Sequence, residues 1–207
     1  MPILLFEAEL AEALIYERMA AIAFEIAPQT VCRHEHAEGG ASRLNWNSKE
    51  QFKNFLACDQ PLSMREIDEE ITRSSAKLGQ APRVFIIDYT QLIPGPGNNR
   101  YERVSETCEE ARRLAKKWKM IGVIVSQIAR PEKSGNSDNY APNLYDAKES
   151  GSFENSCSLV IGLRKLDKLN TIEAKVLKNS RGGAGNTIRM SVRLGCIIEP
   201  EGDERGI

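Results

Sequence analysis

Four consecutive apolar residues, Val84-Phe85-Ile86-Ile87, lead directly into Asp88, and this run constrains the fold more than any other feature of the chain. A continuous apolar run of this kind is typical of a strand buried on both faces of a parallel sheet. Open α/β sheets bind ligands beyond the carboxyl ends of their strands, where Asp88 would lie. In nucleotide-hydrolysing folds an aspartate at this place holds Mg²⁺ beside the phosphates. The run therefore predicts an α/β fold with a metal site at Asp88, although a buried strand can also end in an aspartate without a chemical role.

A second apolar run, residues 121–125, predicts another buried strand and ends in Ser126-Gln127. Because the carboxyl ends of parallel strands meet at one edge of a sheet, the Gln127 amide is expected on the same edge as Asp88. A carboxylate that holds the metal and an amide near the terminal phosphate would together form a nucleotide sensor. The alternative is that Gln127 only leads the strand into a loop.

Composition excludes several classes of protein. The 207 residues suit one globular domain, and the formal net charge of −1 provides no overall basic field, so any DNA contact must come from local placement. Five scattered cysteines without a C-x-x-C pair argue against a disulfide framework or a zinc site and favour reduced thiols in the cytoplasm. No apolar run is long enough to cross a membrane, so no membrane contact is expected.

The remaining patterns predict further secondary structure. Ser63 with Glu66 three residues later forms a capping-box pattern, and Trp118 falls on the apolar face of a predicted helix. The predicted helices cover residues 11–27, 67–78 and 101–119, the predicted strands cover 158–163, 171–177 and 187–194, and a predicted loop covers 33–47.

Three motifs follow one another along the chain. Residues 87–92 read Ile-Asp-Tyr-Thr-Gln-Leu, residues 126–130 read Ser-Gln-Ile-Ala-Arg, and residues 146–155 read Asp-Ala-Lys-Glu-Ser-Gly-Ser-Phe-Glu-Asn. They resemble the Ile-Asp-Tyr-Leu-Gln-Leu, Ser-Gln-Leu-Asn-Arg and Asp-Leu-Arg-Glu-Ser-Gly-Ser-Ile-Glu-Gln segments of the DnaB-type replicative hexameric helicases. The resemblance is to the C-terminal motor domain of that family, a RecA-like ATPase, and it covers essentially the whole chain.

The resemblance implies a fold, cofactors and partners. It implies an α/β, RecA-like P-loop NTPase core with a mainly parallel sheet flanked by helices over residues 1–199. The composition of residues 200–207 predicts an acidic tail. The resemblance implies ATP and Mg²⁺ as cofactors and single-stranded DNA as a partner. It also implies a homo-hexameric ring of phage or bacterial type, with primase and a helicase loader as further partners.

The resemblance also assigns catalytic roles residue by residue. Residues 2–10 resemble the family's strand ending Phe-Ser-Leu-Glu-Met, which makes Glu9 the residue that polarises the attacking water. Glu7 stands in place of the family's Ser and is less suited to that role. Asp88 is implied to hold Mg²⁺, and Gln127 to sense the γ-phosphate.

Two basic residues are implied to act on the ATP site of the adjacent subunit. The basic, glycine-rich stretch 178–185 predicts a hairpin, and it corresponds to the family's Lys-Gln-Arg-Asn-Gly-Pro segment. Lys178 matches well, whereas Arg181 is shifted by one position, so its role as the arginine finger stays open. An arginine there would stabilise charge on the transferred phosphoryl group. The alternative is a plain hairpin turn with solvated charges.

The same resemblance implies contacts to the DNA backbone from Arg130, Lys148, Glu149 and Gly151. Lys148 replaces the family's Arg, which keeps the charge but loses the bidentate fork of a guanidinium. Gly151 can bind a phosphate through its backbone N–H. The alternative for Lys148 is a solvated loop lysine.

One family element is missing from the sequence. A P-loop requires Gly-x-x-x-x-Gly-Lys-Ser/Thr, and no glycine here is followed by lysine. The family's first strand and P-loop precede the Glu-bearing strand at which this chain begins. We therefore expect a fragment or a degenerate relative that is inactive alone. Two alternatives are a non-catalytic DNA-binding or ring subunit, and another RecA-like recombination or repair ATPase. The second is less favoured, because such an ATPase would carry a different loop in place of residues 146–155.

Overall fold

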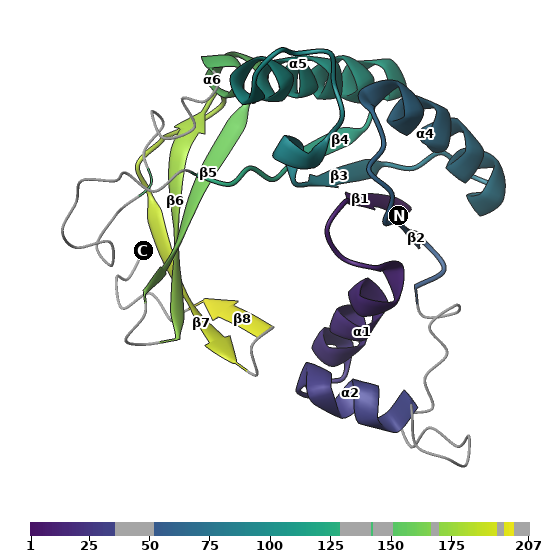
Figure 1. The fold of residues 1–207 in the computed structure, drawn as a ribbon. Coiled ribbons are helices and arrows are strands. Elements are labelled where there is room, and N and C mark those ends of the chain that lie inside the picture. Colours follow the sequence, from purple (N-terminus) through teal and green to yellow (C-terminus); the bar gives the residue numbers. More distant parts are fainter. Residues whose placement is uncertain (36–51, 129–141, 143–150, 167–169, 194–196, 201–207) are drawn as a thin grey trace. The chain divides into compact units, whose positions relative to one another are not determined.

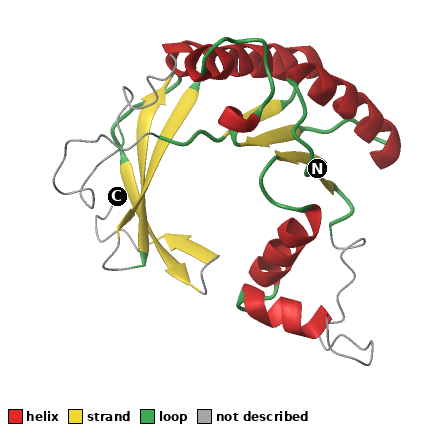
Figure 2. Cartoon of the chain, viewed as in Figure 1, coloured by secondary structure: helices red, strands yellow, loops and turns green. Residues whose placement is uncertain are grey.

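The computed structural model describes residues 1–35, 52–128, 142, 151–166, 170–193 and 197–200. Contacts between residues divide the chain into two compact units, which are described separately. The first unit takes its described residues from 1–16, 45–127 and 149–157, and the second takes them from 17–44, 128–148 and 158–207. Figure 1 labels the helices and strands, and Figure 2 separates them by type.

The first unit contains a four-stranded parallel sheet with the strand order β2-β1-β3-β4. Its strands are β1 (Ile3–Glu7), β2 (Phe55–Cys58), β3 (Val84–Asp88) and β4 (Ile121–Ile124). The predicted strand at 84–88 is confirmed, and Phe85 and Ile87 are fully buried. The α/β fold is therefore confirmed. Strand β2 was not predicted, because four residues give too short a pattern to identify.

Two long helices pack against the parallel sheet, α4 (Met64–Leu78) and α5 (Arg100–Trp118). They lie along the same side of β3 and β4 in Figure 1. The predicted capping box lies at the start of α4. The Ser63 hydroxyl accepts a hydrogen bond from the Glu66 backbone N–H, and the Glu66 carboxylate accepts one from the Ser63 backbone N–H at 2.8 Å. Gly79 ends the helix at φ +66°, a conformation that favours glycine.

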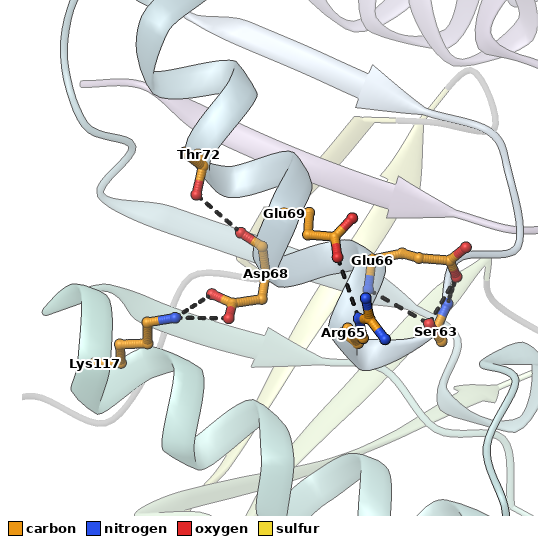
Figure 3. Close-up of polar contacts among 7 residues, drawn as sticks. All are labelled: Ser63, Arg65, Glu66, Asp68, Glu69, Thr72 and Lys117. Atoms are coloured by element: carbon orange, nitrogen blue, oxygen red, sulfur yellow. Dashed lines mark hydrogen bonds and ion pairs between the residues drawn. The ribbon is translucent and has the colours of Figure 1, made fainter.

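Polar contacts join α4 to α5 (Figure 3). The Asp68 carboxylate accepts hydrogen bonds from the Lys117 ammonium at 2.6 and 2.9 Å and from the Trp118 indole N–H at 2.6 Å. Trp118 also packs on the edge of the apolar core, as predicted. The core itself lies between the sheet and these helices, and includes Phe6, Ile67, Ile71, Phe85, Ile87 and Leu114.

The run at 121–125 forms a strand, β4, as predicted, but the prediction that this strand is buried was wrong. In β4, Ile121 is 63% exposed and Val123 is 41% exposed. Among the described strands β4 pairs only with β3, so it forms an edge of the parallel sheet. A continuous apolar run predicts a strand with apolar surroundings, but it does not reveal how many neighbours the strand has.

The predicted helix over 11–27 is two helices, α1 (Glu12–Ala23) and α2 (Pro28–Glu35). The chain turns between them at Glu25, whose φ of +52° is not helical, and Pro28 then occupies the first position of α2, where proline is favoured. The predicted loop over 33–47 is wrong at its start, since α2 continues to Glu35; the rest lies outside the described residues.

The second unit contains a four-stranded antiparallel sheet with the order β5-β6-β7-β8. Its strands are β5 (Leu159–Leu166), β6 (Thr171–Asn179), β7 (Thr187–Arg193) and β8 (Ile197–Pro200). The three strands predicted in this region correspond to β5, β6 and β7. Strand β8 was not predicted, and its last residue, Pro200, is the first residue of the predicted acidic tail.

A short 3-10 helix, η1 (Thr90–Leu92), follows β3, and a short helix, α6 (Gly151–Ser156), lies against α5. Among the described residues, Cys58 and Cys108 are free thiols. Burial raises the pKa of the Cys108 thiol to about 12, so this thiol is neutral and unreactive in the fold. Within the described residues, no helix is both long and apolar enough to cross a membrane.

Candidate functional site

The strand order places a topological switch point between β1 and β3. The chain passes from β1 to β2 on one side, and returns across β1 to β3 on the other side. In open parallel sheets, the crevice at the carboxyl ends of two such strands is where ligands bind. The register pairs Glu7 at the end of β1 with Asp88 at the end of β3. The predicted metal ligand therefore lies at the place where sheet topology favours a ligand.

Two glutamates, Glu7 at the end of β1 and Glu9 two residues later, have different environments. Glu7 is buried, and its Oε1 accepts hydrogen bonds from the backbone N–H groups of Glu9 at 2.8 Å and Leu10 at 3.2 Å. These contacts fold the chain into a turn and leave Glu9 exposed. Glu7 thus has a structural task, whereas the Glu9 side chain is accessible to a ligand. The assignment of Glu9 as the residue that polarises water stays a prediction.

Asp88 is half-buried at the end of β3. Its backbone carbonyl accepts a hydrogen bond from the Ala8 N–H at 3.3 Å, which extends the pairing with β1 past the last strand residue. The peptide bond between Asp88 and Tyr89 is cis.

The end of β4 lies beside the end of β3. The Val125 N–H donates to the Ile87 carbonyl at 2.9 Å, and the Thr90 N–H donates to the Val125 carbonyl at 3.0 Å. Ser126 and Gln127 follow directly, so the predicted placement of Asp88 and Gln127 on one sheet edge is confirmed. The Gln91 side chain contacts this segment and was not identified as a site residue from the sequence. Its position three residues after Asp88 was the available signal.

A further carboxylate at this edge was missed because β2 was not predicted. Asp59 follows β2 directly, and its Oδ2 accepts a hydrogen bond from the Glu12 N–H at 2.9 Å, which caps the start of α1. This bond and a side-chain bond from Gln60 lower the pKa of Asp59 below its usual value. Asp59 is therefore ionised at neutral pH and fixes the turn that carries Glu9.

The residues at the carboxyl edge fit Mg²⁺. Within the described ranges there is no group of three or more His, Cys, Asp or Glu side chains that could form a protein-only metal site. Mg²⁺ is usually bound through one or two carboxylates together with substrate phosphates and water, which suits a strand-end carboxylate such as Asp88. The phosphate cradle differs, since the 207 residues contain no Gly-Lys pair and therefore no P-loop.

Lys178 and Arg181 lie close together in the second unit. Lys178 is in β6, paired in register with Val160 of β5, and Arg181 is exposed in the turn that follows. The Asn179 side-chain oxygen accepts a hydrogen bond from the Arg181 N–H at 3.0 Å, which shapes the turn. The predicted hairpin is therefore confirmed, while the action of the two cations on a neighbouring subunit stays a prediction.

The predicted DNA contacts fall largely outside the described residues. Arg130, Lys148 and Glu149 lie outside them, and Gly151 is the first residue of α6. The Arg112 guanidinium of α5 donates to the Asn155 carbonyl at 3.2 Å, so α6 is tied to a long helix of the first unit. The roles of all four residues in DNA binding stay predictions.

The sequence matches the family model for the DnaB-like helicase C-terminal domain over residues 1–194. It is 30% identical over 112 residues to the replicative DNA helicase DnaC of Bacillus subtilis, and this match covers 49% of this chain and 24% of that protein. It is 22% identical over 191 residues to the replicative DNA helicase DnaB of Treponema pallidum, which covers 91% of this chain and 42% of that protein. The chain thus spans less than half the length of either relative.

Solved structures share the fold. The ATPase domain of G40P superposes with a TM-score of 0.78 at 20% identity, covering 96% of this chain and 74% of that one. A DnaB-like replicative helicase, solved in a study of its interactions with primase, superposes with a TM-score of 0.77 at 20% identity, covering 94% of this chain and 49% of that one. These similarities confirm the RecA-like fold that the sequence motifs implied.

Proposed function

The chain belongs to the DnaB-like helicase C-terminal domain family, and from this premise we propose that it acts as the motor domain of a replicative DNA helicase. In this function, nucleotide bound between subunits of a homo-hexameric ring drives movement along single-stranded DNA in the cytoplasm. A primase and a helicase loader would be its further partners. The P-loop that completes the nucleotide site is not among these 207 residues.

One observation carries the proposal. The segments that end β1, β3 and β4 adjoin at a topological switch point, and each contributes a polar residue: Glu9, Asp88 and Gln127. A base, a metal ligand and an amide at one sheet edge are the groups that phosphoryl transfer to water requires. Their convergence supports a nucleotide site better than any one of the three residues does.

Each residue has a distinct task in this proposal. Asp88 would hold Mg²⁺, which neutralises charge on the phosphates when it is bound. Glu9, exposed beyond the turn that Glu7 fixes, would accept a proton from the attacking water. Gln127 would donate a hydrogen bond to the terminal phosphate. Lys178 and Arg181 would act on the nucleotide of the adjacent subunit, where a cation stabilises developing negative charge.

DNA binding in this proposal depends on local contacts, because the net charge of −1 supplies no general attraction. Arg130, Lys148 and the backbone N–H of Gly151 would contact phosphates of one strand. Glu149, in the same segment, would also contact the DNA backbone. Since these contacts are to the backbone, binding should weaken with salt and show little dependence on base sequence.

The test is nucleotide-dependent binding of single-stranded DNA by the full chain. Anisotropy of a labelled oligothymidine would be measured with Mg²⁺ and either ATPγS, ADP or no nucleotide. We expect tighter binding with ATPγS, and loss of that gain in Asp88→Ala. Glu69→Ala, which changes an exposed carboxylate of α4, is the matched control and should behave as the unmodified chain. Equal DNA binding in all three nucleotide states would overturn the proposal.

A non-catalytic ring subunit is a second candidate, favoured by the absence of a Gly-Lys pair. Such a subunit would bind no nucleotide itself but would supply Lys178 and Arg181 to a neighbour that has a P-loop. Calorimetric titration with Mg·ATP separates the two functions. Binding by the chain alone excludes the non-catalytic subunit. No binding, together with stimulated hydrolysis by a P-loop-containing partner and its loss in Lys178→Ala, would favour it.

A further inference from the structure

The backbone pairing between β3 and β4 ends just before Gln127. Its last bond runs from the Thr90 N–H to the Val125 carbonyl at 3.0 Å. The chain after β3 then turns into the 3-10 helix η1 and no longer runs beside the segment after β4. The peptide groups of Gln127 would therefore have no backbone partner on the β3 side, although backbone N–H and C=O groups near a sheet require partners.

The Gln91 side chain takes the place of that missing strand. Its Nε2 donates to the Gln127 carbonyl at 3.0 Å, and its Oε1 accepts from the Gln127 N–H at 3.3 Å. A side-chain amide thus contacts both the N–H and the C=O of one residue, as a neighbouring strand would.

Two further bonds hold the Gln91 amide itself. Its Nε2 also donates to the Ser126 Oγ at 2.8 Å, and its Oε1 also accepts from the Thr90 Oγ at 3.2 Å. A glutamine amide has two N–H donors and two acceptor lone pairs, so all four of its hydrogen-bonding positions are used. Thr90 is fully buried, which anchors this arrangement to the core. An ordinary surface glutamine would instead exchange its bonds with water.

We propose that Gln91 is a positioning residue that fixes the Ser126–Gln127 segment against the end of β3. The sequence Asp88-Tyr89-Thr90-Gln91 then couples the metal ligand to the phosphate sensor, since both segments share one set of hydrogen bonds. This proposal rests on the proposed function for the role of Gln127, but the coupling itself depends only on the contacts described.

The side-chain chemistry explains why glutamine suits this position. Glutamate has no donor for the Gln127 carbonyl, and asparagine is one methylene shorter. Methionine has nearly the same length and volume but can make none of the four bonds. Gln91→Met therefore removes the hydrogen bonds while keeping most of the packing, and is the variant of choice.

The experiment measures backbone amide exchange by NMR in the full chain and its variants. In Gln91→Met the Gln127 amide should exchange roughly tenfold faster, as expected for the loss of one net hydrogen bond. The amides of Phe85 and Ile87 in β3 should keep their rates. Gln60→Met is the matched control, because Gln60 makes a single exposed side-chain bond, to Asp59 at 3.1 Å. It should leave the Gln127 amide unchanged.

A second readout separates positioning from general stabilisation. The ratio of the dissociation constants for Mg·ADP and Mg·ATPγS should fall severalfold in Gln91→Met and in Gln127→Ala. The double variant should show no additional loss, because residues that act as one unit are not additive. The positioning role would be overturned if the exchange rate of the Gln127 amide did not change, or if amide exchange rose uniformly across β3. An unchanged ratio of the two nucleotide dissociation constants would overturn it as well. If the unmodified chain binds neither nucleotide, its proposed function fails, and amide exchange alone decides whether Gln91 fixes the segment.

Discussion

The two sheets of this chain bury different kinds of side chain. In the parallel sheet of the first unit, helices cover strands whose inward side chains are apolar, and every member of the apolar core cluster found among the described residues belongs to this unit. In the antiparallel sheet, Thr171 and Glu173 are buried on β6, while Leu159, Ile161 and Leu163 of β5 are exposed. The first sheet is stabilised mainly by hydrophobic burial, and the second depends on strand pairing and an ion-pair network.

The network in the antiparallel sheet centres on one acid. Glu173 is 8% exposed, and its carboxylate pairs with the Arg164 guanidinium at 2.7 Å and with that of Arg189 at 3.5 Å. Because the three residues come from β6, β5 and β7, the acid ties three neighbouring strands together. The comparison teaches that the sheet edge carrying Asp88 and Gln127 is built on an apolar core, whereas Lys178 and Arg181 belong to a unit in which charged side chains pair across three strands.

The largest effect is expected from Phe85→Ala. Phe85 is fully buried in β3, and a side chain at Gly122 would come within 2.6 Å of its ring, so the packing leaves no spare space. Removing the ring should lower the free energy of unfolding by about 3–5 kcal/mol. Urea denaturation monitored by circular dichroism measures this change.

Leu163→Ala in β5 is the matched control. Leu163 is 59% exposed, so its truncation should change stability by less than about 0.5 kcal/mol. A loss comparable to that of Phe85→Ala would mean that the exposed apolar face of β5 is covered in solution, and the contrast between the two sheets would not hold.

The second prediction concerns Glu173→Gln. Removing the charge of the buried Glu173 leaves the Arg164 guanidinium without its carboxylate partner and should lower the free energy of unfolding by about 2 kcal/mol. Glu25→Gln provides the control in the same unit, because Glu25 pairs with Arg193 at 3.0 Å but is 67% exposed. That exposed pair should contribute less than about 1 kcal/mol. Equal losses in the free energy of unfolding for the two variants would show that the burial of Glu173 adds no stability.

The stability difference between the unmodified chain and Glu173→Gln should depend on pH, because the pKa of Glu173 is shifted. The hydrogen bond and charge of Arg164, assisted by Arg189, outweigh partial desolvation and lower that pKa below its usual value. A lowered pKa in the folded state gives stability that is present above the unfolded-state value, about 4.3, and is lost as the pH falls through the folded-state value. The difference in the free energy of unfolding between the unmodified chain and Glu173→Gln should therefore be largest at neutral pH and should decrease in acid.

A different contrast, between local patterns and spatial neighbours, explains which features the sequence could predict. Strand β3 was predicted because an uninterrupted apolar run has few other interpretations, and the cap at Ser63 because two side chains at fixed spacing define it. The exposure of Ile121 and the contacts of Gln91 could not be predicted in this way. Each depends on which segments become neighbours in space, and no local pattern records that.

A smaller effect is expected from Asp68→Asn in the first unit. Partial burial opposes ionisation of Asp68, but hydrogen bonds from Lys117 and Trp118 outweigh it and lower the pKa. The Lys117 and Asp68 side chains are 53% and 30% exposed, so the variant should lose about 1 kcal/mol. The Trp118 indole N–H signal in NMR should shift, since its acceptor changes. Glu69→Gln, which breaks only the exposed pair with Arg65, should leave stability and that signal unchanged.

The smallest effect is expected from Ser63→Ala at the start of α4. The Ser63 hydroxyl accepts the Glu66 N–H and donates to the Glu66 carboxylate, and these bonds are visible in Figure 3. Loss of such a cap typically costs about 1 kcal/mol or less at an accessible site. Ser63→Thr retains a hydroxyl and should restore most of that stability in thermal denaturation. Because α4 is already held by Ile67 and Ile71 in the apolar core, amides in its middle should keep their exchange rates while only the first turn opens. Opening of the whole helix would mean that the cap, rather than hydrophobic burial, holds α4 in place, contrary to the contrast between the two sheets.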